Sequence, residues 1–166
     1  VTLERTVAKI AVQASTTAEF SERYSGKVRI NSAVLSKAAS RSNLIAQQTP
    51  NTGPMTFTHT QAADELSGKF RNLFYVPENG ELAEGSRLLL TLGATYDRDG
   101  NFSTTDDQAE VAYSIELSGD GAGRFLRNGY YRVQALIDGL TGSELSVSIS
   151  VADWEPPVTQ SVNLGQ

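Results

Sequence analysis

The chain has 166 residues, a formal charge of −5, no cysteine and one histidine. Its length allows one domain of ordinary size, and its 39% apolar and 20% charged residues are typical of a folded protein rather than a disordered one. This composition excludes disulfides, cysteine-ligated zinc and multi-histidine metal sites, and the lack of any block of basic residues argues against nucleic acid as a partner.

The N-terminal segment has the pattern of a strand with one apolar face. Ala8, Ile10 and Val12 recur at every second position, which is the period of a half-buried strand. Residues 14–18 are small and polar and suit a linker. We therefore expect a domain boundary near residues 15–25.

The next part of the chain begins as a strand and then loses its periodicity. Val28, Ile30 and Val34 fall on one parity of a second strand. Residues 36–47 show no sustained helical period, so we expect a loop there. Residues 47–60 are rich in Gln, Thr, Pro and Asn, which predicts a long irregular connection or an insertion.

The second half of the chain alternates most regularly. Three sets of apolar residues recur with period two, and turn-forming clusters lie at 77–80, 97–101 and 119–123. This pattern predicts an all-β fold, an antiparallel β-sandwich of the transthyretin-like or immunoglobulin-like kind. The three sets are Val111, Tyr113, Ile115 and Leu117; Tyr131, Val133, Ala135 and Ile137; and Leu145, Val147, Ile149 and Val151.

One predicted turn is strongly acidic. Residues 97–101 place oxygen-bearing side chains at alternate positions, as calcium loops do, and two further carboxylates follow at 106–107. The register is not that of an EF-hand, because Phe102 and Gln108 stand where that loop needs glycine and glutamate. A solvated hairpin turn is the favoured interpretation, with adventitious cation binding as the alternative.

No catalytic constellation can be named from the sequence. His59 lies in a threonine-rich stretch, and no Gly-x-Ser-x-Gly elbow supplies a nucleophile for it. The glycine-rich residues 119–123 precede a strand pattern rather than the helix that a nucleotide-binding loop requires. We therefore expect no enzymatic activity, no catalytic residue, no metal and no cofactor.

The C-terminal residues form a short apolar pattern after two prolines. Pro156 and Pro157 cannot donate to a strand ladder, so we expect them to end the domain's own strand and redirect the chain. Val158, Val162 and Leu164 then fall on one parity. Such a strand could pair within its own domain or be offered to another molecule, and periodicity alone does not choose between these.

Four motifs occur in order along nearly the whole chain. Residues 3–10 carry an Arg-x-x-Ala-Lys-Ile strand, and residues 74–79 an aromatic-Tyr-x-x-Glu-Asn segment. Residues 125–133 contain Arg-Asn-x-x-Tyr-x-Val, and residues 151–154 form a Val-x-x-Trp strand end. In this order the motifs resemble those of the fimbrillin family, the shaft-forming subunits of type V pili on Gram-negative anaerobes.

The resemblance implies a two-domain β-sandwich protein. Residues 1–18 would then be the last strand of an otherwise missing N-terminal β domain, residues 19–155 the C-terminal β-sandwich domain, and residues 156–166 a tail that serves as donor strand. It also implies a lipidated precursor carried to the outer membrane. In the family, an arginine-specific protease removes an N-terminal strand, and the groove left behind accepts a donor strand from the next subunit.

We therefore predict a structural subunit of a cell-surface pilus that polymerises by donor-strand exchange and supports adhesion. Its expected partners are copies of itself or related pilins, with host or bacterial surface receptors as further candidates. The alternative is a carbohydrate- or protein-binding β-sandwich module of a secreted or lipid-anchored surface protein. Such a module needs an exposed aromatic platform or a polar pocket, and its C-terminal strand would stay paired within its own domain.

Overall fold

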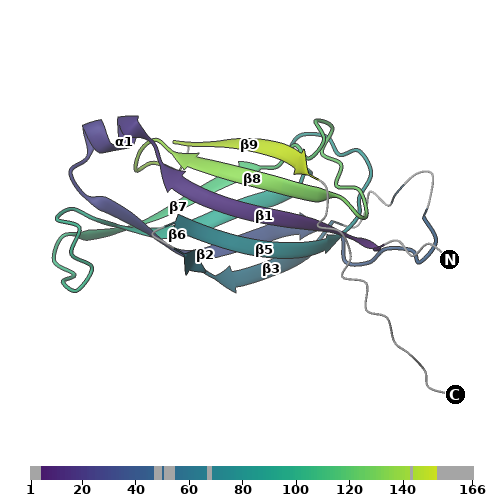
Figure 1. The fold of residues 1–166 in the computed structure, drawn as a ribbon, viewed down its shortest axis with the longest axis horizontal. Helices are drawn as coiled ribbons and strands as arrows, with labels where there is room; N and C mark the ends of the chain where they lie inside the picture. Colours follow the sequence, from purple (N-terminus) through teal and green to yellow (C-terminus); the bar gives the residue numbers. More distant parts are fainter. Residues whose placement is uncertain (1–4, 47–49, 51–54, 67–68, 143, 153–166) are drawn as a thin grey trace, which may run out of the picture.

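The computed structural model describes residues 5–46, 50, 55–66, 69–142 and 144–152, which form two packed β-sheets (Figure 1). Sheet A has the strand order β4-β5-β1-β8-β9, and sheet B has the order β3-β2-β6-β7. The predicted all-β sandwich is confirmed, with one parallel pair, β1 with β8, among antiparallel ones. The elements are β1 Val7–Thr16, α1 Ala18–Arg23, β2 Lys27–Ala38, β3 Phe57–Ala62, β4 Glu65–Leu66, β5 Lys69–Pro77, β6 Leu89–Asp97, β7 Gln108–Glu116, β8 Tyr130–Ile137 and β9 Leu145–Ala152.

Strand β1 lies in the middle of sheet A. It pairs with β5 on one side and β8 on the other, so its backbone is hydrogen-bonded along both edges. Ala8, Ile10 and Val12 are fully buried, as the alternation predicts, and they belong to the same core as the later strands. The expected domain boundary at 15–25 therefore does not separate β1 from this sandwich, and residues 7–18 are part of the domain that follows them.

Residues 14–18, which were predicted to be a linker, are instead the end of β1 and the start of the short helix α1. The Thr17 hydroxyl accepts a hydrogen bond from the Phe20 amide at 3.2 Å, which caps the first turn of α1. Glu19 in the first turn and Arg23 in the last complement the helix dipole. Phe20 is buried and anchors the helix at one end of the sandwich. Tertiary packing therefore supplies the stability that an isolated six-residue helix would not have.

Strands β2 and β3 occupy parts of the segments that were predicted to be a loop and an irregular connection. Strand β2 continues to Ala38 through a register shift after Leu35, and Lys37 takes a positive φ of 59° there. Strand β3 pairs with β2 as an edge strand of sheet B. Most of its residues are exposed, so it lacks the apolar alternation by which a strand is recognised in a sequence.

The core fills the space between the sheets. Inward-facing side chains from both sheets form one buried cluster, which Phe20 and the loop residue Phe125 extend at its margins. The largest fully buried side chains are Tyr113, Phe20, Phe74, Phe125, Ile10, Leu35, Leu88, Leu90, Leu92, Leu117, Ile137 and Val12.

Candidate functional site

In the part of the chain that the structure describes, the side of the sandwich between β7 and β9 is incompletely covered. These are the edge strands of sheets B and A, and they lie near each other across the sandwich. Along β9 the inward-facing apolar residues become steadily more exposed, from Leu145 at 7% through the half-buried Val147 and Ile149 to Val151 at 63%. The inward residues of the neighbouring strand β8 are all buried. The described residues therefore leave an apolar margin beside an edge strand, where one further strand could pack.

Two of the sequence motifs meet in the folded protein. Glu78, from the segment after β5, forms an ion pair with Arg127, from the segment before β8, and each side chain is only 8% exposed. Arg127 also donates to the Ser42 hydroxyl and to the Asn43 carbonyl, so it ties three loops together. The hydrogen bond from Arg127 is the main reason that the pKa of Glu78 lies below its usual value. The pair is a structural clamp.

Side-chain amides and a tyrosine hold the loops around this clamp. The buried Asn79 amide donates to the carbonyls of Gly80 and Gly123 at 2.8 and 2.7 Å. The Tyr131 hydroxyl accepts from the Leu126 amide at 2.8 Å. The motif residues of 74–79 and 125–133 thus fix the path of the chain between strands.

A second clamp joins α1 to the turn between β8 and β9. Arg23 forms an ion pair with Glu144 at 2.7 Å, and the Glu144 carboxylate also accepts from the Thr141 amide and hydroxyl at 3.0 Å. These bonds lower the pKa of Glu144 to about 2, with the Thr141 backbone bond contributing most. The Tyr113 hydroxyl donates to the Gly139 carbonyl of the same turn at 2.8 Å. Burial raises the pKa of Tyr113 to about 12.

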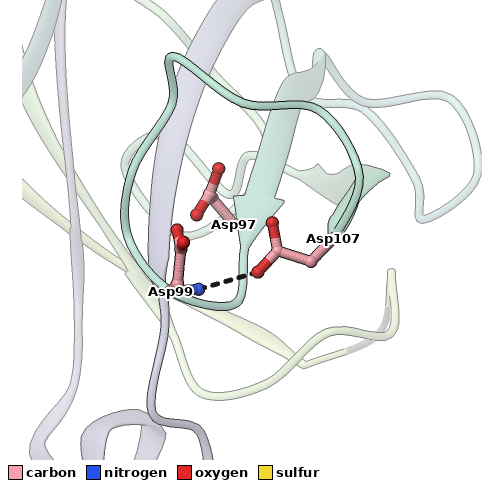
Figure 2. Close-up of side chains that lie close together, drawn as sticks. All are labelled: Asp97, Asp99 and Asp107. Carbon is pink, nitrogen blue, oxygen red and sulfur yellow. Dashed lines mark hydrogen bonds between the residues drawn. The ribbon is translucent and has the colours of Figure 1, made fainter.

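Three carboxylates gather in the connection between β6 and β7 (Figure 2). Asp97 is fully buried, and its two oxygens accept from the Asn101 amide at 2.9 Å and the Gln108 side chain at 2.9 Å. The Asp99 amide donates to Asp107 at 3.0 Å, the bond drawn in Figure 2. These are the contacts of a side-chain-stabilised turn, as the hairpin interpretation expects.

The same cluster has the geometry to hold a cation. One oxygen from each of the three carboxylates lies within 4.8 Å of the others. Burial acts to raise the pKa of Asp97, but the hydrogen bonds that its carboxylate accepts in the turn lower it overall. The hydrogen bond from the Asn101 amide acts to lower the pKa of Asp99, but the nearby carboxylates of Asp97 and Asp107, together with burial, raise it overall. A hard divalent cation would have to compete with the hydrogen bonds that already close the turn.

The described surface includes two depressions that could hold a ligand. One, of about 580 Å³, lies at the α1 end and is lined by Phe20, Tyr24 and Phe102, among others. The other, of about 380 Å³, lies on the outer face of sheet A, and its lining includes Arg71 and Arg132. Both offer polar and aromatic side chains to a ligand.

The predicted donor-strand residues lie outside the described residues. This applies to Pro156, Pro157, Val158, Val162 and Leu164, so their predicted roles stay predictions. His59 lies in β3 and packs edge-on against Phe57 at 4.6 Å between ring centroids. Within the described residues, no helix is long and apolar enough to cross a membrane.

No protein-family model and no curated protein matches this sequence. Among solved structures, the chain is similar to a candidate cell adhesion protein of Parabacteroides distasonis, with a TM-score of 0.65 and 14% identity over 95% of this chain and 54% of that one. A candidate cell adhesion protein of Bacteroides eggerthii aligns with a TM-score of 0.55 and 15% identity, over 91% of this chain and 56% of its own.

A fimbrial protein shares the same fold. The tip fimbrial protein of Porphyromonas gingivalis, solved with a C-terminal truncation, aligns with a TM-score of 0.50 and 16% identity, over 91% of this chain and 52% of its own. The chain therefore spans about half the length of the solved structures that it resembles. At sequence identities of 14–16%, this structural similarity shows a shared fold and nothing further.

Proposed function

We propose that this chain belongs to a structural subunit of a cell-surface fimbria that supports adhesion and has no catalytic role. The fold that it shares with candidate cell adhesion proteins and with a tip fimbrial protein supports this proposal. So does the order of the four motifs that resemble fimbrillins. Other fimbrial subunits, copies of itself or relatives, would be its partners at the cell surface.

The observation that carries the proposal is the half-covered margin between β7 and β9. Strand addition needs an unpaired strand edge for main-chain hydrogen bonds and apolar pockets for alternate side chains. Among the described residues β9 is the edge strand of sheet A, and its Val147, Ile149 and Val151 offer apolar side chains against which alternate residues of an added strand could pack. Val111 and Ile115 of β7, both partly buried, face the same margin from sheet B.

The donor in this proposal is the tail 156–166 of a neighbouring subunit. Val158, Val162 and Leu164 share one parity, so all three can point into the margin when the tail lies along β9. Each apolar side chain that moves from water into this margin contributes on the order of 1 kcal/mol or more to association. Pro156 and Pro157 would direct the tail out of its own domain.

Filament formation by the full-length mature protein tests the proposal. Two changes should abolish filaments seen by electron microscopy and sizing: deletion of 156–166, and Val151→Glu, which places a charge in the margin. The matched control is Ser146→Glu, on the same strand but with its side chain on the opposite, exposed face. It should leave filaments intact.

Circular dichroism must show that both altered proteins are folded. If the parent forms no filaments, if deletion of the tail unfolds the domain, or if the two glutamate variants behave alike, the strand-addition proposal is wrong. The binding-module alternative would then become the leading one.

A further inference from the structure

The outer face of sheet A presents a regular array of side chains. Because Ala8, Ile10 and Val12 point into the core, the alternate residues of β1 point outward, and the register aligns them with outward residues of β5 and β8. Sheet A is the nearer layer in Figure 1. Across β5, β1 and β8 the rows are Tyr75, Lys9 and Tyr130; Leu73, Ala11 and Arg132; and Arg71, Gln13 and Gln134.

Small side chains in this array create a depression. Ala11 lies at its centre, and Ser148 and Ser150 of β9 lie at its margin, between the longer side chains of β5 and β8. Its volume of about 380 Å³ falls within the range of about 300–1,000 Å³ that is typical of ligand pockets. A small ligand, or part of a larger one, fits here.

The face carries positive charge on a negatively charged protein. Arg71 and Arg132 line the depression, and Lys9 lies in the adjacent row. None of the described residues that line the depression is acidic, although the chain as a whole carries a formal charge of −5. The face is therefore complementary to an anion.

Two of these three cations, Lys9 and Arg132, lie against the same aromatic ring. The Lys9 ammonium lies 4.4 Å from the centroid of the Tyr130 ring, and the Arg132 guanidinium carbon lies 5.3 Å from it. Side chains that are ordered before a ligand arrives lose less conformational entropy when it binds. Arg132 is thus prepared to make paired hydrogen bonds to a carboxylate or sulfate group.

The remaining polar groups fit a polyhydroxylated ligand. Gln13, Gln134, Ser148 and Ser150 offer amide and hydroxyl groups that both donate and accept hydrogen bonds. An acidic peptide is a poorer fit, because the cationic and amide side chains lie on β1, β5 and β8, which each lie between two partner strands and leave no strand edge there to extend.

We infer that this depression is a binding site for an anionic saccharide, with a uronate or sulfated sugar held by Arg71 and Arg132 and its hydroxyls by the glutamines and serines. The inference goes beyond a role in assembly and does not depend on it. The proposed saccharide site lies on the outer face of sheet A, whereas strand addition would use the margin between β7 and β9.

Calorimetric titration with a defined saccharide tests the inference. The probe is a tetrasaccharide that alternates glucuronate with N-acetylglucosamine, and its carboxyl-reduced form is the neutral control. The parent chain should bind the glucuronate tetrasaccharide and should not bind its carboxyl-reduced form. Arg132→Gln, and separately Gln134→Glu, should each weaken binding about tenfold or more, because one removes a charge-assisted hydrogen bond and the other adds a repelling carboxylate.

The matched control is Arg98→Gln, which removes the same charge from the exposed connection after β6 and should leave the affinity unchanged. Thermal unfolding checks that each variant is folded. The inference is overturned if the parent does not bind the uronate probe, if Arg98→Gln weakens binding as much as Arg132→Gln does, or if a glutamate-rich peptide binds and the saccharide does not.

Discussion

At the residue scale, the ion pair between Glu78 and Arg127 shows why two motifs far apart in sequence occur together. Both residues lie in segments singled out by resemblance, and the structure shows that they meet in a site from which water is largely excluded. The carboxylate of Glu78 is buried only because Arg127 neutralises it. Their shared role is to hold loops in place.

Removing one partner should therefore cost more than removing both. Arg127→Met leaves a buried carboxylate without its cation, and we expect the free energy of unfolding in urea to fall by about 3 kcal/mol. Adding Glu78→Gln to that variant should restore part of the loss. Equal losses in the single and double variants would mean that the two residues do not act as a pair.

The lowered pKa of Glu144 predicts how the stability of the folded protein changes at acidic pH. Its pKa of about 2 lies below the ordinary value of 4.5, so the clamp stabilises the folded state above pH 4.5 and loses this effect as the pH falls toward 2. Glu144→Gln should lower the melting temperature near pH 7, and the difference from the parent should shrink across that window. Glu84→Gln, at an exposed position, is the control and should show no such trend.

At the element scale, β1 is the strand whose role differs most from the expectation. Its alternation was enough to predict a strand, but a period of two does not reveal which strands pair with it. The parallel pairing with β8 joins segments more than a hundred residues apart, and only the fold as a whole determines it.

The central position of β1 predicts a large effect of a core truncation there. Ile10→Ala should lower the free energy of unfolding by about 3 kcal/mol, because the side chain is fully buried between the sheets. Gln13→Ala, on the exposed face of the same strand, should change it by less than about 0.5 kcal/mol. If urea titration showed that both substitutions lower the free energy of unfolding by similar amounts, the placement of β1 at the centre of the core would be contradicted.

The other elements show where sequence patterns succeed. Strands β7, β8 and β9 have one apolar and one polar face, so alternation predicts them. Strand β3 is mostly exposed, and β6 begins within the run Leu88–Leu90, which hides its alternation; neither could be recognised by period alone. Helix α1 depends on the Thr17 cap and the burial of Phe20, and a six-residue segment offers no period to detect.

At the scale of the whole molecule, the candidate margin could be predicted only in part. Alternation identifies the apolar parity of Val147, Ile149 and Val151 along β9. That β9 is an edge strand beside β7, with its apolar side half covered, follows from the order of strands in both sheets. The cationic face of sheet A likewise comes from register, because Arg71 and Arg132 are brought to one depression by β1 lying between their strands.

The most direct measurement of the central claim is disulfide trapping between two differently tagged chains. The chain contains no cysteine, so an introduced pair reports only on its own proximity. One chain carries Val151→Cys, and the other carries Val158→Cys, Val162→Cys or Leu164→Cys. Strand addition predicts a crosslink between chains for at least one of these three pairs. It predicts none when Ser146→Cys replaces Val151→Cys. Crosslinks that form equally well from both positions, or from neither, would contradict it.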